Sequence, residues 1–226
     1  MTFHILTLFP EIFPILSDYS ILQRARKQGL IDIKTYNLRD FGIGQRKQVD
    51  DTPYGGGAGM VIRVDVVDAA IKNLKSKIEN LKSVLLTPQG KKFDQKTAVR
   101  LSRVENLLLI CGHYEGFDER IRDLVDQEIS IGDYILTGGE LPAMVIIDAI
   151  SRLLPGVLGK DESSTEESFN QKLLEYPHYT KPAVYQKKAV PAILTSGHHQ
   201  AIAQWRQEQS LIRTKTRRPD LMKESP

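Results

Sequence analysis

The sequence predicts an α/β fold, a parallel β-sheet with helices on both faces, followed by a small α-helical domain. Up to about residue 158, short runs rich in Leu, Ile and Val alternate with stretches of helical periodicity, as is typical of parallel sheets covered by helices. Residues 159–170 are expected to form a flexible linker, because residues 159–168 lack apolar side chains. Residues 171–226 are basic and contain prolines ahead of a long helical pattern, which indicates a separate domain.

Five strands and five helices are expected in the first domain, residues 1–158. The clearest helix follows Asp65, where Val66, Ala70 and Leu74 recur near 3.6-residue spacing with lysines on the opposite side. In the second domain, a helix is expected from about Ser196. The strand candidates are Phe3–Leu8, Ile31–Asn37, Ser83–Thr87, Leu107–Cys111 and Glu128–Ile131, and the helix candidates are residues 11–28, 64–80, 95–104, 117–125 and 140–154.

Composition favours a soluble, cytoplasmic protein. The chain has 226 residues, of which 41% are hydrophobic and 26% charged, and this is ordinary globular usage. No apolar run approaches the roughly 20 residues of a membrane helix, since Leu141–Leu154 is interrupted by Asp148 and Arg152. The N-terminus lacks the basic region of a signal peptide. The single cysteine, Cys111, excludes an internal disulfide and fits a reducing compartment.

Positive charge is concentrated towards the C-terminus. Residues 1–170 contain 21 Lys and Arg against 24 Asp and Glu, whereas residues 171–226 contain 10 against 4. A basic module indicates an anionic partner, nucleic acid rather than membrane, although some basic tails serve only solubility. Here the cations are interleaved with aromatic residues, which suits RNA because phosphates and unstacked bases are both contacted. Trp205 is assigned to the core of the second domain, so the arginines carry this prediction.

The long connection at residues 40–63 contains the most conspicuous motif, Pro53-Tyr-Gly-Gly-Gly-Ala-Gly-Met60. Glycines permit positive φ and let a ligand approach the backbone closely, and loops of this length inside a compact domain are usually functional. The motif is not a Walker A loop, because no Lys follows at the required spacing, and it lacks the preceding strand of a Rossmann fingerprint. The alternative is a flexible surface turn.

Three further loops each follow a predicted strand, namely Leu86–Gly90, Ile110–Gly116 and Ser130–Pro142. Because ligands of α/β sheets bind at the carboxyl ends of strands, we expect these loops to line one crevice. Glycine and apolar backbone there fit an adenosine-like ligand better than a polyphosphate, since the only basic side chains nearby are Lys91 and Lys92. The sequence has neither metal ligands at diagnostic spacing nor a Ser-His-Asp order.

In combination, these motifs resemble the signature of the bacterial tRNA (guanine-N1-)-methyltransferase family of the SPOUT superfamily. The resemblance implies a deep trefoil knot at the cofactor site and an obligate homodimer whose active site is built across the interface. It also implies transfer of the methyl group of S-adenosylmethionine to N1 of guanosine 37 in tRNA. It rests, in order along nearly the whole chain, on the glycine-rich loop, Gly112–Gly116 with Asp118-Glu-Arg120, Ser130–Pro142, Pro155–Gly159, Tyr176–Thr180 and the stretch from Trp205 to Pro219.

The same resemblance implies where the two substrates bind. The target base would lie near the glycine-rich loop, and the basic tail would hold the tRNA. His113 stands where relatives commonly have Arg. The cofactor-binding residues implied are Leu86, Thr87, Pro88, Gly112, Ile131, Gly132, Asp133, Tyr134, Ile135, Leu136, Gly138 and Gly139, and the tRNA-binding residues implied are Gly55, Gly56, Gly57, Gly59, His113, Arg213, Arg217 and Arg218.

Three residues are assigned to the chemistry by this resemblance. Glu167 occupies the position of the family's general base, usually an Asp before Ser-Phe, and would remove the N1 proton of guanine. Arg152 would stabilise the negative charge that develops on O6, and Glu115 matches a carboxylate near the cofactor. Glu167 departs from the pattern by one methylene, and Glu166 is a competing base. The alternative is that Glu167 is only a solvated carboxylate without a role in the reaction.

Other features remain open on the sequence alone. The resemblance implies a requirement for magnesium, for which no ligand set is evident. A SPOUT enzyme could instead act on another RNA site, such as a ribosomal nucleotide, and a non-catalytic RNA-binding or assembly factor could keep the same fold. The intact glycine-rich loops together with Arg152 and Glu167 favour the tRNA-modifying enzyme.

Overall fold

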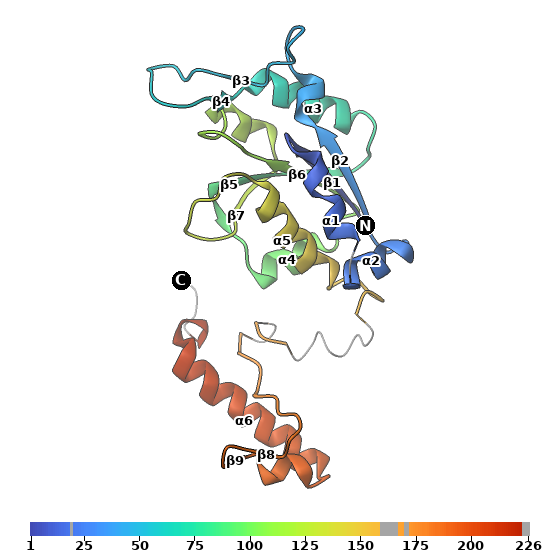
Figure 1. Ribbon diagram of the computed structural model, residues 1–226, viewed down its shortest axis with the longest axis vertical. Coiled ribbons are helices and arrows are strands. Elements are labelled where there is room, and N and C mark those ends of the chain that lie inside the picture. Colours follow the sequence, from blue (N-terminus) through green and yellow to red (C-terminus); the bar gives the residue numbers. More distant parts are fainter. Residues whose placement is uncertain (19, 159–166, 170–171, 223–226) are drawn as a thin grey trace. The chain divides into compact units, whose positions relative to one another are not determined.

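The computed structural model describes residues 1–18, 20–158, 167–169 and 172–222 (Figure 1). The chain divides into two compact units, unit 1 over Met1–Gly159 and unit 2 over Lys160–Pro226. Of the predicted linker, residues 159–170, all but residues 167–169 lie outside the described part of the chain. Within the described part, no helix is both long enough and apolar enough to cross a membrane.

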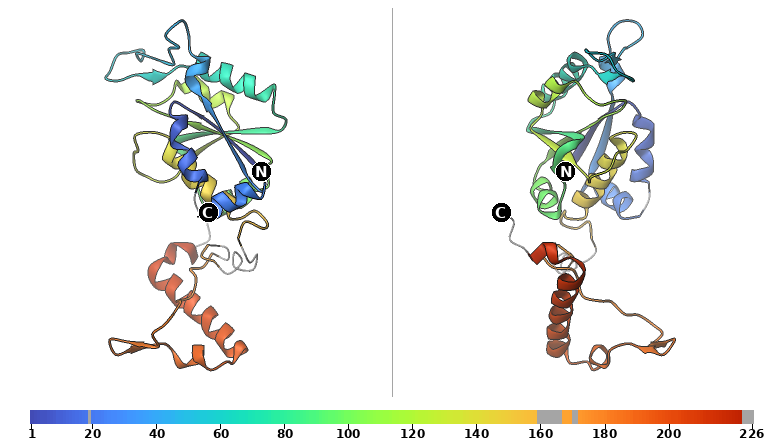
Figure 2. Two further views of the ribbon diagram at one scale, coloured as in Figure 1. Left: turned by 45° about the vertical axis from the view of Figure 1, so that its right-hand side comes forward. Right: turned by 90° about the vertical axis from the view of Figure 1, so that its left-hand side faces the viewer.

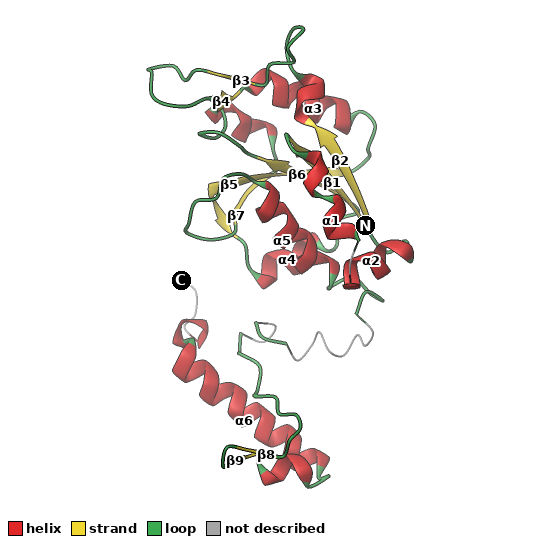
Figure 3. Cartoon of the chain, in the orientation of Figure 1, coloured by secondary structure: helices red, strands yellow, loops and turns green. Residues whose placement is uncertain are grey.

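A five-stranded sheet forms the centre of unit 1 (Figure 3). Its strand order is β2-β1-β6-β5-β7, and every neighbouring pair runs parallel. Runs of Leu and Ile form the central strands β1 and β6 because both faces of the sheet are buried there, so neither face selects for polar side chains. The five predicted strands are therefore confirmed. Their bounds are β1 Thr2–Thr7, β2 Asp32–Asn37, β5 Leu81–Lys92, β6 Asn106–Cys111 and β7 Gln127–Ser130.

Helices cover both faces of this sheet, as the alternation predicted (Figure 2). The helix expected over residues 11–28 is divided into shorter elements, because Pro10 and Pro14 each begin a new one at a position where a backbone N–H is not needed. The helix expected over 117–125 is a 3-10 helix. The bounds are η1 Pro10–Ile12, α1 Pro14–Ser17, α2 Ser20–Lys27, α3 Val64–Lys75, α4 Gln95–Leu101, η3 Glu119–Leu124 and α5 Glu140–Ser151.

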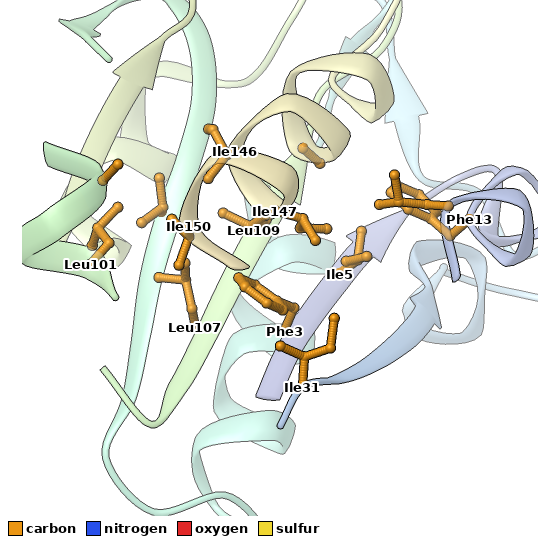
Figure 4. Close-up of a cluster of buried hydrophobic side chains, with 14 of the residues drawn as sticks. Phe3, Ile5, Phe13, Ile31, Leu101, Leu107, Leu109, Ile146, Ile147 and Ile150 are labelled. Atoms are coloured by element: carbon orange, nitrogen blue, oxygen red, sulfur yellow. The ribbon is translucent and has the colours of Figure 1, made fainter. Parts of the chain in front are cut away.

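Each face of the sheet has its own apolar core. On one face, Phe3 and Leu107 pack with the buried side of α5, including Ile146 and Ile150 (Figure 4). On the other face, alternate strand residues pack against α3 and η3 in a second cluster. This arrangement follows from strand geometry, since successive side chains point to opposite faces. The two cores hold the helices against the sheet. The loops that connect strands and helices therefore lie at the ends of the strands.

Strand β5 departs most from its predicted end at Thr87. Both Leu86 and Lys91 pair with Ile129 of β7, so residues 87–90 bulge out of the sheet and the strand then resumes. A Cβ at Gly90 would lie 2.5 Å from the backbone nitrogen of Ile129, so only glycine allows the strand to return this closely. The Pro and Gly that marked a strand end in the sequence mark a bulge in the structure.

The connection at residues 40–63 also contains short regular elements that were not predicted. A 3-10 helix, η2 (Leu38–Phe41), precedes it, and β3 (Asp50–Asp51) pairs antiparallel with β4 (Val61–Ile62). The glycine-rich motif is therefore the tip of a hairpin. The pairing of β3 with β4 holds the two arms of the hairpin together at its base.

Unit 2 is built on one long helix, α6 (His199–Arg217), which begins three residues after the predicted start. Lys215 and Arg217 occupy its last turn, where positive charge favours the helix dipole. A two-stranded antiparallel hairpin and two 3-10 helices complete the described part of unit 2. These elements are β8 Val184–Tyr185, β9 Lys188–Ala189, η5 Ala192–Thr195 and η6 Pro219–Met222.

Candidate active site

A cavity of about 530 Å³ lies at the bulge of β5 and at the carboxyl ends of β6 and β7 in unit 1. These strands are neighbours in the sheet, so the loops that follow them converge as expected. Among the residues assigned to cofactor binding, Asp133 is absent from the lining, and its exposed carboxylate pairs with Lys92 at 3.4 Å. The assigned residues that line the cavity are Leu86, Thr87, Pro88, Gly112, Ile131, Gly132, Tyr134, Ile135, Leu136, Gly138 and Gly139.

Close backbone contacts explain why glycine is required on two sides of the cavity. The backbone N–H of Gly139 donates to the carbonyl of Gly112 at 2.9 Å. A Cβ at Gly139 would lie 2.6 Å from Cα of Cys111, and one at Gly112 would lie 2.7 Å from the ring of Phe117. Substitution at Gly139 would therefore meet backbone atoms that cannot move aside. The loop before α5 thus passes directly against the end of β6.

Buried Glu140 fixes the start of α5 to the end of β1. Its carboxylate accepts a hydrogen bond from the hydroxyl of Thr7 at 2.6 Å, and Thr7 in turn accepts one from the backbone N–H of Phe9 at 3.0 Å. Burial raises the pKa of the Cys111 thiol well above its usual value, and the charge of Glu140 raises this pKa further. The thiol therefore stays protonated and behaves as a small apolar side chain.

His113 and Glu115 both line the cavity and flank it on the β6 side. The His113 ring packs edge-on against Phe9 and Tyr114, with ring centroids 4.9 Å apart in each pair. Its Nδ1 atom is buried and has no hydrogen-bond partner among the described residues. Glu115 is exposed, and its carboxylate faces the region where Gly59 approaches.

The glycine-rich loop is anchored to the rim of this cavity. Backbone hydrogen bonds join Glu115 N–H to the carbonyl of Met60 at 3.0 Å, and Ile62 N–H to the carbonyl of Gly116 at 2.9 Å. Gly59 has a φ of +83°, and a Cβ there would overlap the Glu115 side chain. At the tip, Tyr54 is fully exposed. The loop therefore starts at the cavity and projects from it.

Ionic side chains on the η3 side complete the lining, and one of them, Arg122, belongs to none of the motifs identified in the sequence. The Arg122 guanidinium is hydrogen-bonded to Gln89 and pairs with Glu119 at 3.1 Å and with Glu128 at 3.6 Å. The neighbouring carboxylate of Asp118 is held ionised, because hydrogen bonds from Arg120 lower its pKa. Gln89 lies in the predicted loop Leu86–Gly90, and Arg122 lies in η3, which follows β6.

A family model described as tRNA (Guanine-1)-methyltransferase TrmD matches residues 1–224. The chain belongs to this family. It is 54% identical to the tRNA (guanine-N(1)-)-methyltransferase of Syntrophomonas wolfei over 98% of this chain and 90% of that protein. The protein of the same name from Clostridioides difficile is 53% identical over 100% of this chain and 99% of its own length. The one from Staphylococcus epidermidis is 51% identical over 98% and 90%. The family predicted from the motifs is therefore confirmed.

The family resemblance assigned chemistry to two residues that lie in different units. Arg152 follows α5 in unit 1, where its exposed side chain leaves the helix end and its backbone N–H caps the helix on Asp148 at 3.3 Å. Glu167 belongs to unit 2 and is partly buried. Glu166, the alternative to Glu167 as the candidate general base, lies outside the described residues.

The arginines assigned to tRNA binding lie at the end of α6 and just beyond it. Arg217 is exposed and Arg213 is half-buried. Arg218 is engaged within unit 2, since its guanidinium binds the Asp220 carboxylate at 2.7 Å and lies 5.8 Å from the centre of the Phe169 ring. Within the described part of the chain, no cluster of three or more His, Cys, Asp or Glu side chains is placed to hold a metal ion.

Proposed function

We propose that this chain is a cytoplasmic tRNA (guanine-N1-)-methyltransferase, which transfers the methyl group of S-adenosylmethionine to N1 of guanosine 37 in tRNA. The family match over residues 1–224 carries this proposal, and the glycine-lined cavity supports it. A deep trefoil knot at the cofactor site is part of the proposal. The contact of Gly139 with the end of β6 agrees with a chain that passes closely through its neighbours at this point.

The residues of the cavity fit S-adenosylmethionine. A volume of about 530 Å³ lies within the roughly 300–1,000 Å³ usual for cofactor and small-molecule sites. Its walls are mainly glycine backbone and apolar side chains. Arg122, the cation among its lining side chains, is paired with carboxylates and is therefore not available for a polyphosphate. When bound, the cofactor supplies a strongly electrophilic methyl group, so the protein mainly has to orient it and exclude water.

Guanine N1 carries a proton and is a poor nucleophile until that proton leaves. In the proposed mechanism, the carboxylate of Glu167 accepts this proton. The electron pair left on N1 forms the new N–C bond, while negative charge shared with O6 is stabilised by the guanidinium of Arg152. Glu115 contributes a carboxylate on the β6 side of the cavity. Magnesium is implied by the resemblance, and the described residues show no ligand set that would hold it.

The decisive experiment is methyl transfer from labelled S-adenosylmethionine to total tRNA, followed by mapping of the modified nucleotide. We expect label at N1 of guanosine 37. Label in ribosomal RNA would instead favour a related enzyme with another target. Cofactor binding without transfer to any RNA would favour the non-catalytic alternative.

A homodimer is the expected active form. Leu141 and Val145, one helical turn apart on α5, are 52% and 49% exposed, and Ile12 and Ile15 on the same side of the sheet are also exposed. Apolar side chains in this arrangement are typical of an interface. We expect sedimentation to give a dimer, and Val145→Glu to give an inactive monomer. A matched change at an exposed valine of unit 2, Val184→Glu, should leave the dimer intact; an active wild-type monomer would contradict the proposal.

Binding of tRNA by unit 2 should depend steeply on salt. Each phosphate that the protein no longer neutralises reduces the slope of log affinity against log salt concentration by about 0.7–0.9. We expect Arg213→Gln with Arg217→Gln to weaken tRNA binding and flatten this slope by roughly one and a half. The control is Lys75→Gln with Lys77→Gln at the end of α3, which should leave both quantities unchanged. Equal slopes for wild type and the arginine variant would show that the phosphates are held elsewhere.

A further inference from the structure

The segment that carries Glu167 is tied to helix α6 within unit 2. We infer that Thr214 of α6 is a positioning residue, which holds this segment in the geometry that proton removal from guanine requires. The inference rests on the proposed role of Glu167 as the general base. It assigns a task to a buried hydroxyl that neither the family motifs nor the cavity in unit 1 explains.

Thr214 is completely buried, and its hydroxyl both donates and accepts a hydrogen bond. The hydroxyl donates to the carbonyl of Ser210 at 2.7 Å and accepts from the backbone N–H of Leu174 at 2.8 Å. A hydroxyl is the smallest side-chain group that can do both. Valine has nearly the same shape but would leave the N–H of Leu174 without this partner. The chain at Leu174 is therefore fastened to the last turns of α6.

A compact turn transmits this attachment back to the glutamate. The backbone N–H of Glu175 donates to the Ser168 hydroxyl at 3.0 Å, and that of Phe169 donates to the carbonyl of Leu173 at 2.8 Å. Phe169 has a φ of +78°, a left-handed conformation that a bulky residue keeps only when its surroundings hold it there. Residues 168 and 169, which directly follow Glu167, are thus fixed to residues 173–175, and these are fixed to Thr214.

A second contact holds the same turn from the end of the helix. The guanidinium of Arg218 lies 5.8 Å from the centre of the Phe169 ring, within the range of cation–π attraction. Two hydrogen bonds of 2.7 and 2.9 Å to the Asp220 carboxylate keep the guanidinium in this place. Arg218 therefore stabilises the turn at Phe169, and it also adds to the positive charge of the tail.

This arrangement puts the proposed base and the proposed tRNA-binding helix on one piece of structure. A general base must come within about 3 Å of the proton that it removes, and an error of about 1 Å can cost as much as 100-fold in rate. If α6 engages the tRNA, its position also sets the position of Glu167. The hydroxyl of Thr214 joins α6 to this segment at Leu174.

The test compares three variants of the full-length enzyme. Thr214→Val removes the hydroxyl, Thr214→Ser keeps it, and Thr216→Val is the matched control. Thr216 makes the same bond to the carbonyl four residues earlier, at 2.9 Å, but on an exposed side of α6. With saturating tRNA and S-adenosylmethionine, we expect single-turnover methylation to slow about 10- to 100-fold in Thr214→Val. The other two variants should stay within about twofold of wild type, and tRNA affinity should be unchanged in all three.

A double variant that combines Thr214→Val with Glu167→Gln distinguishes a positioning role of Thr214 from a general loss of structure. If Thr214 acts through Glu167, the valine substitution should slow Glu167→Gln no further, because effects of residues that act as a unit are not additive. Hydrogen exchange should also become faster at the Leu174 amide in Thr214→Val but not in Thr216→Val. Full additivity of the two substitutions, or equal rates for the two valine variants, would overturn the inference and leave the proposed function intact.

Two further outcomes keep the test decisive. A Glu167→Gln enzyme as fast as wild type would refute the proposed base itself, independently of Thr214. If Thr214→Val does not fold, Ser168→Ala removes the second link of the turn at a partly exposed site. We expect that variant to lose about tenfold in single-turnover rate, and an unchanged rate would count against positioning by this turn.

Discussion

Glu167→Gln is expected to slow single-turnover methylation about 10²- to 10⁴-fold, the usual loss when a general base is removed. The amide keeps the size of the side chain but cannot accept the N1 proton of guanine. Binding of S-adenosylmethionine should be unchanged, because Glu167 is not among the residues that line the cavity. Arg152→Ala should cause a comparable loss, since the charge on O6 would lose its partner.

The matched control is Glu166→Gln. A solvating carboxylate should contribute almost nothing to the rate, so this variant is expected to match wild type. If Glu166→Gln is slow and Glu167→Gln is not, the base is the preceding residue. If both are fast, neither residue of this pair removes the proton, and the proposed mechanism fails at its first step.

Gly139→Ala is expected to weaken binding of S-adenosylmethionine about 10- to 100-fold. The added methyl group would lie 2.6 Å from Cα of Cys111 and 2.7 Å from the backbone nitrogen of Gly112, so two walls of the cavity would have to separate. Overpacking of this kind typically costs about 1–3 kcal/mol, and one of the displaced residues, Gly112, lines the cavity. Calorimetric titration with the cofactor measures the effect.

Gly29→Ala serves as the control for the glycine substitution. Gly29 follows α2 with a φ of +71° and nothing within 4 Å of an added Cβ, so alanine there causes backbone strain without a clash. We expect Gly29→Ala to lower the melting temperature and leave cofactor affinity unchanged. Unaltered affinity in a folded Gly139→Ala protein would mean that the contact between the β7–α5 loop and β6 does not shape the cofactor site.

The centre of the sheet could be predicted closely from the sequence because burial on both faces produces the continuous apolar runs of β1 and β6. Strands β1, β2, β6 and β7 begin and end within one residue of their expected positions. The same logic placed the loops at the cavity, since parallel strands deliver their carboxyl ends to one edge. The bulge of β5 was not foreseeable in this way, because Pro88 and Gly90 carry the same local signal in a bulge as in a strand end.

The parts of the site that escaped prediction depend on contacts between distant residues. The bonds from Thr7 to Glu140 and from Arg122 to Gln89 join segments that only the folded chain brings together. Asp133 was assigned to cofactor binding by the resemblance; its exposed side chain pairs with Lys92 and is not part of the lining. A motif fixes where the backbone passes, whereas the direction of each side chain is set by its neighbours.

The burial of Cys111 has a practical consequence for studying this enzyme in solution. A thiol with 1% exposure and a raised pKa forms little of the thiolate that alkylating reagents attack. The natural chain, which has no other cysteine, therefore behaves towards such reagents as if it had none. One cysteine introduced on the surface of each unit, for example at Lys75 and at Lys188, would accept fluorescent dyes at those two points alone. Energy transfer between the dyes would then report the distance between these two points with and without tRNA.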